Sequence, residues 1–352
     1  MNRLGTAIIG FGQIAQGYAS DPQMRIHFRY ATHAQVLQEH PAFEWKAVVD
    51  ISDDALHQAQ DKWGIQHVAR AITSLQCLEE IEVAVIATPP EHRVGLIESM
   101  PALKAILVEK PLGRTIQECQ QFLDICERRQ ILVQVNLLRR TDSKMQELAG
   151  GRLRQLIGLP QCTSVFYGNG LMNNGTHMID LVRMLIGEVL EVRAISNAAD
   201  FEQGPVSGDR NFSFSLAMND GSSCILHPLR FDNYRENSID IWGEHGRLSV
   251  IQEGLTMLRY EAGPHRAMEG CRELACDNPT KECTGISTAL YEMYTNLNAG
   301  ISVGTELASS GVSALRTAAV VQAAFTSLHH HGSPVCPDNL LLDSTENRVV
   351  LA

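Results

Sequence analysis

The sequence predicts an α/β protein whose N-terminal part is a doubly wound parallel sheet. Three observations support this fold class. A short apolar run at residues 7–9 leads straight into a glycine-rich turn. Apolar strand patterns and amphipathic helix patterns then alternate as far as residue 137, as they do in parallel α/β sheets. Residues 211–218 instead alternate apolar and polar side chains, which indicates half-exposed strands in the second half.

The first apolar run ends at the turn Gly10-Phe-Gly-Gln-Ile-Ala15. Gly10 permits the tight turn, Gly12 has no side chain to keep a pyrophosphate from the backbone, and Ala15 allows close packing of helix on strand. A helix predicted over residues 13–20 would direct its free N–H groups and its positive dipole end at that phosphate. A strand before the turn and a helix after it favour dinucleotide binding over an ordinary strand–helix turn.

A long connection, residues 21–43, follows, and within it residues 32–39 resemble a short extra helix. Residues 44–50 form the second predicted strand, which ends at Asp50. An acidic residue there usually lies about 20 residues past the glycines and hydrogen-bonds the adenosine ribose, and here the connection lengthens the spacing. A carboxylate would repel a 2′-phosphate, so Asp50 favours NAD over NADP. The alternative is a helix N-terminal role, which the two following aspartates can already fill.

Two further strands end in turns that contain proline. Residues 83–87 run into Thr88-Pro-Pro90, and residues 105–108 run into Glu109-Lys-Pro111. Loops at the carboxyl ends of such strands border the ligand crevice. His92, beyond the first turn, either faces the cofactor or caps the next helix, and capping is the simpler interpretation.

Lys110 follows apolar residues at the end of a strand, a poor place for a free surface charge. In the crevice its ammonium group could orient a hydroxyl and stabilise charge that develops on oxygen during hydride transfer. A structural ion pair with Glu109 is the alternative, and the residues alone leave both open. The N-terminal half ends with a predicted helix at residues 115–128 and a predicted strand at residues 131–135. Asn136 and Arg139 follow the carboxyl end of that strand.

In the second half, residues 262–284 lack periodicity and are predicted to form an ordered loop. The His329-His-His331 run is attributed to the charge preference of a helix C-terminus. Predicted strands lie at residues 189–196, 211–218, 223–226, 239–242, 247–250 and 256–260, and predicted helices at 142–149, 177–185, 286–299 and 307–329.

The turn at residues 10–15, Ala87-Thr-Pro-Pro90 and Glu109-Lys-Pro111 occur in that order. Residues 168–180 then fit the pattern G-x-G-x-x-x-x-G-x-H-x-x-D. Together these motifs resemble the Gfo/Idh/MocA oxidoreductases, the relatives of glucose–fructose oxidoreductase and inositol dehydrogenase. The resemblance implies a Rossmann domain over residues 1–137. It also implies a C-terminal α/β domain, residues 138–352, with a large open mixed, mostly antiparallel sheet that often serves in oligomer contacts, so a homodimer or homotetramer is expected.

The same resemblance favours catalysis by Lys110 and places His177 in the substrate site. An imidazole titrates near neutral pH and can accept the proton of a carbinol as its hydride leaves. Asp180, one turn later on the same face, would hold the imidazole tautomer or contact substrate. Many dehydrogenases of the family carry an aspartate four residues before this histidine. Here that residue is Asn173, whose amide cannot act as a base, so proton transfer would fall to His177 with Lys110.

The sequence therefore predicts a cytoplasmic, NAD-dependent oxidoreductase acting on a sugar or a nucleotide-linked sugar. The asparagine-rich segment and the long first connection look most like relatives from surface-polysaccharide pathways, so a UDP-sugar 3-dehydrogenase is the sharpest hypothesis. A polyol or inositol dehydrogenase and a non-catalytic NAD-binding regulator are the alternatives. The predicted catalytic residues are Lys110 and His177; the substrate-binding residues are Asp180, Asn173, Asn174 and Arg139; the cofactor-binding residues are Gly10, Phe11, Gly12, Gln13, Ile14, Asp50, Thr88, Pro89, His92, Glu109, Lys110 and Asn136.

Composition sets outer limits on function. The net charge of −11 and the isoelectric point near 5.6 argue against nucleic acid as a partner. No stretch approaches the ~20 uncharged apolar residues that cross a bilayer, and no signal-peptide pattern opens the chain. The nine cysteines are odd in number and lack a C-x-x-C pair, as expected of reduced thiols. Cys271, Cys276 and Cys283 lie near His265, but their spacing fits no common zinc pattern, so no metal is predicted.

Overall fold

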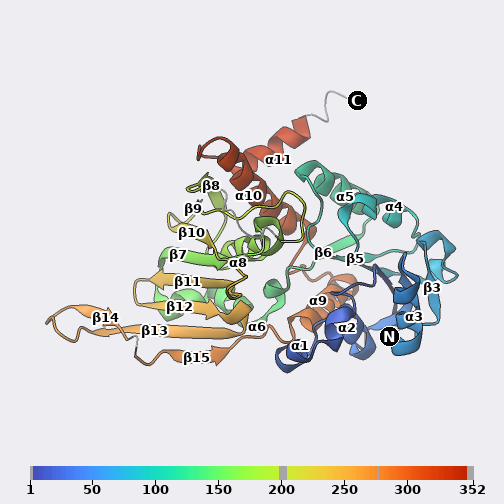
Figure 1. The fold of residues 1–352 in the computed structure, drawn as a ribbon, viewed down its shortest axis with the longest axis horizontal. Coiled ribbons are helices and arrows are strands. Elements are labelled where there is room, and N and C mark those ends of the chain that lie inside the picture. Colours follow the sequence, from blue (N-terminus) through green and yellow to red (C-terminus); the bar gives the residue numbers. More distant parts are fainter. Residues whose placement is uncertain (1–2, 198–203, 276, 347–352) are drawn as a thin grey trace. The chain divides into compact units, whose positions relative to one another are not determined.

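The computed structural model describes residues 3–197, 204–275 and 277–346, which divide into two compact units (Figure 1). Unit 1 holds the residues up to 141 together with 286–315, and unit 2 holds 142–285 and the residues from 316 onward. The predicted boundary at 137/138 lies close to the first crossing between the units. Residues 286–315 return to unit 1 through contacts between distant parts of the chain.

Unit 1 contains a six-stranded parallel sheet with the order β3-β2-β1-β4-β5-β6, which confirms the predicted doubly wound fold. Its strands are β1 (Leu4–Ile9), β2 (Phe43–Val49), β3 (His67–Ala69), β4 (Val83–Ile86), β5 (Ala105–Val108) and β6 (Leu132–Val135). The strand order reverses between β1 and β4, and sheets of this kind bind ligands outside the carboxyl ends of the strands at that point.

Helices cover both faces of this sheet. Side chains of α2, α3 and α9 share one buried cluster with the inward residues of the strands, and Figure 1 shows α4 and α5 on the other side of the strands. Thr32 caps α2 through its side chain, and Gly64, at φ 70°, ends α3 in the left-handed conformation. The helices are α1 (Pro22–His27), α2 (His33–Glu39), α3 (Asp53–Trp63), α4 (Arg93–Glu98), α5 (Ile116–Arg128) and α9 (Ala289–Val303).

The segment after the glycine turn differs from the helix predicted over residues 13–20. It forms a single hydrogen-bonded turn, in which the N–H of Gln16 donates to the carbonyl of Gly12 at 3.0 Å. A short 3₁₀ helix, η1 (Gly17–Ser20), follows. A glycine inside the segment lowers its helix propensity, and Pro22 starts a new helix. The predicted long helix dipole behind the turn is therefore wrong, and the backbone N–H groups of the turn are what remain for a phosphate.

Unit 2 contains a nine-stranded sheet with the order β14-β13-β12-β11-β7-β10-β9-β8, in which β15 also pairs with β13. Among the described strands of this sheet, only the β7–β10 pair is parallel, so the predicted mixed, mostly antiparallel sheet is confirmed. The strands are β7 (Pro160–Tyr167), β8 (Val189–Ala194), β9 (Phe214–Met218), β10 (Ser223–Pro228), β11 (Ser238–Gly243), β12 (Gly246–Ile251), β13 (Thr256–Pro264), β14 (Arg272–Leu274) and β15 (Thr280–Cys283). The prediction of a loop over residues 262–284 is wrong, because this segment contains β14, β15 and the end of β13.

One face of this sheet packs on α8 and α10, which share a buried core with the inward residues of the strands. The helix predicted over residues 142–149 is present as α6, and a π-helical turn, η6 (Leu148–Arg152), in which Gly151 has φ 107°, connects it to α7. The helices are α6 (Ser143–Glu147), α7 (Leu153–Ile157), α8 (Thr176–Leu185), α10 (Gly311–His329) and α11 (Pro337–Glu346). Of the helices in the described ranges, none is long and apolar enough to cross a membrane.

Candidate functional site

The glycine turn leaves an opening and unused donors at the end of β1. A Cβ on Gly10, which has φ +89°, would lie 2.9 Å from the carbonyl of Ala87, so only glycine fits there. A Cβ on Gly12 would meet nothing within 4 Å. Within the described part of the chain, the backbone N–H groups of Gly12, Gln13 and Ile14 have no hydrogen-bond acceptor. The turn therefore offers donors around an open space, which suits an anionic group such as a pyrophosphate.

Asp50 ends β2 with its carboxylate against this turn. Its Oδ2 accepts from the N–H of Phe11 at 2.6 Å, and its Oδ1 accepts from the N–H of Ser52 at 2.8 Å. Ser52, not Asp50, is the N-cap of α3, since its side chain accepts from the N–H of Ala55. Each carboxylate oxygen keeps a lone pair for another donor such as a ribose hydroxyl. This position suits the predicted ribose role, which stays a prediction.

A buried arginine ties together the two turns that contain proline. The side chain of Arg93, in a residue that is 2% exposed, donates to the carbonyls of Thr88 at 2.7 Å, Pro111 at 2.6 Å and Leu112 at 3.1 Å. Burial lowers the pKa of this guanidinium to about 10, so it stays charged at neutral pH. Arg93 thus fixes the backbone on both sides of Lys110, which is half-buried and precedes a cis peptide bond to Pro111. No local sequence pattern predicts this role of Arg93.

Glu109 is held by groups from two other elements. Its Oε1 accepts from Nδ2 of Asn136 at 2.6 Å and lies 3.0 Å from Nε2 of His33, whose Nδ1 lies 2.9 Å from the Tyr294 hydroxyl. Burial raises the pKa of the Glu109 carboxyl, but the hydrogen bond from His33, the Asn136 amide and the charge of Lys110 together hold it below its ordinary value. Glu109 is therefore an ionised carboxylate next to the ammonium of Lys110.

Two buried polar atoms at these strand ends lack partners. Oγ1 of Thr88, after β4, and Oδ1 of Asn136, after β6, are buried with no hydrogen bond to any described residue. Buried polar groups are nearly always hydrogen-bonded in folded proteins, so these two atoms are available to a bound ligand. Together with the open cradle at Gly12, they fit a dinucleotide. Pro89 begins the turn before η4 (Pro90–His92), and the side chain of His92 lies outside what the structure describes.

In unit 2, the predicted histidine segment is anchored by a buried aspartate. A π-helical turn, η7 (Leu171–Gly175), leads into α8, where His177 is half-buried in the first turn. Asp209, at 0% exposure, accepts from the N–H of Met172 at 2.8 Å through Oδ1 and from the N–H of Asn173 at 3.0 Å through Oδ2. Burial raises the pKa of Asp209, and these N–H donors oppose that rise. The sequence prediction missed Asp209.

The asparagines of this segment have different surroundings. Nδ2 of Asn173 donates to the carbonyl of Asn169 at 3.1 Å, whereas Nδ2 of Asn174 is buried and has no partner among the described residues. An unpaired buried amide N–H next to the histidine segment is a donor that a substrate hydroxyl could use. The predicted substrate-binding role is thus better supported at Asn174 than at Asn173.

Asp180 lies deeper than a substrate ligand normally does. It is 1% exposed, its Oδ1 accepts from the Thr317 hydroxyl of α10 at 3.0 Å, and it lies 3.7 Å from the guanidinium of Arg183. These contacts hold α8 against α10. Arg139 is half-buried in the short helix η5 (Leu138–Thr141). Substrate binding by Asp180 and by Arg139 stays a prediction.

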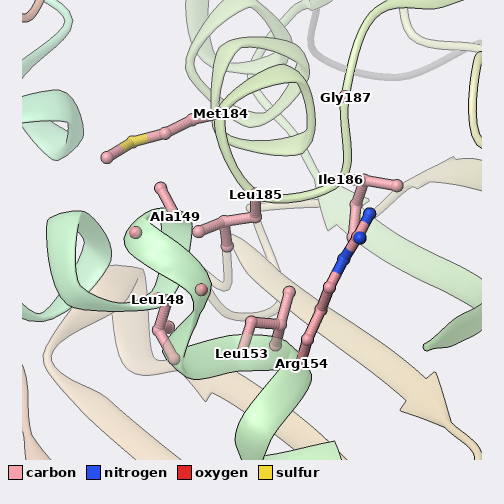
Figure 2. Close-up of a pocket in the computed structure, with 10 residues that line it drawn as sticks. Leu148, Ala149, Leu153, Arg154, Met184, Leu185, Ile186 and Gly187 are labelled. Carbon is pink, nitrogen blue, oxygen red and sulfur yellow. The ribbon is translucent and has the colours of Figure 1, made fainter. Parts of the chain in front are cut away.

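A separate cavity of about 390 Å³ lies at the other end of α8 (Figure 2). Leu148, Leu153, Arg154 and Leu185 are among the residues that line it. None of the predicted site residues lines it. Over the described ranges 3–197, 204–275 and 277–346, no group of three or more His, Cys, Asp or Glu side chains could hold a metal ion. Cys276, part of the cysteine cluster considered above, lies outside those ranges.

Each of the two units contains a segment that matches a known family of protein domains. Residues 4–137 match the model of an oxidoreductase family with an NAD-binding Rossmann fold. Residues 163–249 match the GFO/IDH/MocA C-terminal domain. The two matched segments include the glycine turn, the Glu-Lys-Pro turn and the histidine segment.

Individual relatives are more distant. The rhizopine catabolism protein MocA of Rhizobium meliloti is 26% identical over 244 residues, which cover 64% of this chain and 71% of that protein. The D-apiose dehydrogenase of Paraburkholderia graminis is 20% identical over 318 residues, 84% of each chain. Among solved structures, the WlbA dehydrogenase of Chromobacterium violaceum in complex with NADH and UDP-GlcNAcA has a TM-score of 0.73 at 19% identity and covers 96% of both chains.

Proposed function

The chain belongs to the Gfo/Idh/MocA family of NAD-binding oxidoreductases, and on that premise we propose that it moves a hydride between NAD and a ring carbon that bears a hydroxyl in a sugar or a sugar nucleotide. The observation that carries this proposal is the set of strand ends in unit 1. The turn at Gly12 is open and rich in free donors, the Asp50 carboxylate lies against it, and the buried oxygens of Thr88 and Asn136 lack partners.

The predicted cofactor residues of unit 1 would hold the dinucleotide. The free N–H groups of Gly12, Gln13 and Ile14 suit its pyrophosphate, and the Asp50 carboxylate suits a ribose with two free hydroxyls. The same carboxylate would repel the 2′-phosphate of NADP. When bound, NAD supplies the acceptor or donor of the hydride.

We assign the chemistry at the hydroxyl to Lys110 and His177. The ammonium group of Lys110, fixed by the turn that Arg93 holds, orients the substrate hydroxyl and stabilises negative charge developing on its oxygen. The imidazole of His177 takes the hydroxyl proton during oxidation and returns it during reduction. Asn174 contributes a free amide donor for a neighbouring hydroxyl, with Asn173, Asp180 and Arg139 as further proposed substrate contacts.

Within this proposal we favour a nucleotide-linked sugar, and a UDP-sugar 3-dehydrogenase in particular. The long connection before β2 and the paired asparagines support this choice, and the similar WlbA structure contains UDP-GlcNAcA. D-apiose dehydrogenase, a relative of similar length, is named for a free sugar. Free sugars and polyols, including inositols, therefore form the second part of the substrate panel.

The oligomeric state and the compartment are also proposals. On the face of the unit 2 sheet away from α8, the guanidinium of Arg247 lies over the rings of Trp242 at 4.6 Å and Tyr260 at 4.9 Å. Trp242 is still 38% exposed, which supports this face as the contact of a homodimer or homotetramer. Free buried thiols at Cys119 and Cys224 support a reducing compartment such as the cytoplasm.

The test adds NAD to the purified protein with nucleotide-linked sugars, free sugars and polyols, and follows the absorbance of NADH. We expect turnover with at least one UDP-sugar. The Lys110→Ala variant should lose about 100-fold or more in kcat while it still binds NAD, because the ammonium acts on the substrate hydroxyl. Lys104→Ala is the matched control, since Lys104 precedes the same strand and pairs with Glu82 at 2.6 Å on the surface.

Each outcome has a clear meaning. Turnover by the Lys110→Ala variant at the wild-type rate would refute the assigned role of that lysine. Measurable NAD binding without turnover of any member of the panel would instead favour a non-catalytic regulator.

A further inference from the structure

The long connection between β1 and β2 carries a buried histidine at the start of α2. The backbone N–H groups of His33 and Ala34 donate to the carbonyls of Ile14 at 3.3 Å and Ala15 at 2.9 Å, so the first turn of α2 is fixed to the glycine turn. Thr32 caps the helix, and His33 is only 1% exposed. Its ring therefore has one fixed position inside unit 1.

The neighbours of this ring define its tautomer. An ionised carboxylate only accepts hydrogen bonds, so Nε2 of His33, 3.0 Å from Oε1 of Glu109, carries a proton and donates it. Burial raises the pKa of the Tyr294 hydroxyl well above its ordinary value, so this phenol keeps its proton and can donate to Nδ1 of His33 at 2.9 Å. Tyr294 is 0% exposed, so the chain of hydrogen bonds ends in the core and offers no route for protons to water.

We propose that His33 is a positioning residue of the active site: it donates from Nε2 to Oε1 of Glu109 and keeps that carboxylate ionised and in one orientation beside Lys110, while Tyr294 fixes the tautomer of His33. Oε2 of Glu109 accepts no hydrogen bond from the described side chains, so it is left for a bound ligand. The kinetic consequence rests on the proposed function, whereas the effect on Glu109 is a property of the protein alone.

The charges that face Glu109 show what removal of His33 would do. Desolvation raises the pKa of the Glu109 carboxyl, and it is opposed by His33 from α2, by the amide of Asn136 after β6 and by the charge of Lys110. The charge of Arg93, from α4, also interacts with Glu109. Without the His33 donor, the unfavourable burial would be less compensated, and the carboxyl would become easier to protonate.

The direct test is a ¹³C NMR titration of the glutamate carboxyls, with the Glu109 signal assigned by its loss in Glu109→Gln. The His33→Leu variant should raise the pKa of Glu109 by about one to two units, the size of one hydrogen bond to a charged group. In the His33→Gln variant the pKa of Glu109 should stay close to its wild-type value, because the side-chain amide of glutamine places an N–H where Nε2 was. An unchanged Glu109 pKa in His33→Leu would overturn the inference.

Tyr294→Phe keeps the test decisive if the leucine variant does not fold. It removes only the hydroxyl that fixes the tautomer, so we expect a smaller rise of the Glu109 pKa in the same direction. His40→Gln is the matched control: His40 is the buried residue that ends α2, and it contacts Thr295 of α9 at 3.2 Å rather than Glu109. A rise of the Glu109 pKa in His40→Gln equal to that in His33→Leu would reduce His33 to a general packing role.

Kinetics give the second readout. In His33→Leu the acid limb of the pH profile of kcat should move to higher pH, with a smaller change in the KM for the sugar, and His33→Gln should move it back. An acid limb that stays in place while the Glu109 pKa rises would also overturn the positioning role. A wild-type protein that turns over no sugar would defeat the proposed function only, because the NMR titration still decides the role of His33.

Discussion

The two segments that carry the proposed catalytic residues are held by single buried charges of opposite sign. In unit 1, the cation of Arg93 donates to three backbone carbonyls around the turn of Lys110. In unit 2, the anion of Asp209 accepts from backbone N–H groups in the segment that precedes His177. Neither charge belongs to the segment that it holds.

The difference in sign follows from which backbone groups each segment leaves unpaired. The turns after β4 and β5 contain prolines, which have no N–H, so carbonyls outnumber donors there and a guanidinium with five N–H groups suits them. The segment before α8 leads into a helix, whose first N–H groups have no partner within the helix, so a carboxylate suits it. An irregular loop can thus be made rigid by one side chain that supplies what the backbone lacks.

Removal of the cation should have the largest effect. Arg93→Met leaves the carbonyls of Thr88, Pro111 and Leu112 without that donor in the core, and we expect a loss of about 4 kcal/mol in the free energy of unfolding. Arg93→Lys keeps the charge but has no planar fork, so about 2 kcal/mol should be lost. Urea denaturation measures both. A stability of Arg93→Lys equal to that of the wild type would show that charge, rather than donor geometry, holds these turns.

Removal of the anion should have a smaller effect. Asp209→Ala leaves the N–H groups of Met172 and Asn173 without an acceptor, which should cost about 2 to 3 kcal/mol. Asp209→Asn keeps one oxygen but turns an NH₂ group toward one of these N–H groups. Because burial already penalises the carboxylate, the amide should cost only about 1 kcal/mol in urea denaturation, while the KM for the sugar rises. An asparagine variant as unstable as the alanine variant would contradict this account.

These two charges also show where sequence reasoning ends. The glycine turn, the Glu109-Lys-Pro111 turn and the histidine segment could be predicted, because each motif is local and its residue types have a direct chemical reason. Arg93, Asp209 and Tyr294 could not, because their partners lie on other segments. Leu112 is 19 positions from Arg93, Met172 is 37 from Asp209, and His33 and Tyr294 are 261 positions apart. No local pattern distinguishes an arginine that donates into the core from one that faces water.

The fold shows the same division. β1, β4 and β5 of the parallel sheet were predicted because they are buried on both faces and read as apolar runs, and β2 and β6 were also predicted, whereas β3 (His67–Ala69) was not. β7 (Pro160–Tyr167) was missed, since it has no continuous apolar run and only Thr163, Val165 and Tyr167 are buried. The helix predicted over residues 13–20 was wrong because Gly17 and Pro22 interrupt a pattern that periodicity alone would continue.

Unlike the buried charges of Arg93 and Asp209, His40 is a buried titratable group that stays neutral. It is 5% exposed, its Nε2 contacts the Thr295 hydroxyl at 3.2 Å, and its Nδ1 accepts from the N–H of Ala42 at 3.3 Å. Both nitrogens are thus used by uncharged partners. Burial lowers the pKa of this imidazole from 6.5 to about 4.

The contribution of His40 to the free energy of unfolding should therefore depend on pH. Between about pH 6.5 and 4 the unfolded chain binds a proton at this site and the folded protein does not, so stability falls as the pH falls through this window. From pH 7 to pH 5 this one group should remove about 2 kcal/mol from the free energy of unfolding. His40→Gln, which cannot titrate, should lose that much less over the same range in urea denaturation. Equal losses of unfolding free energy in the wild type and the variant would mean that His40 is protonated in the folded protein over this range. Unit 1 would then hold a buried cation at His40 in addition to Arg93.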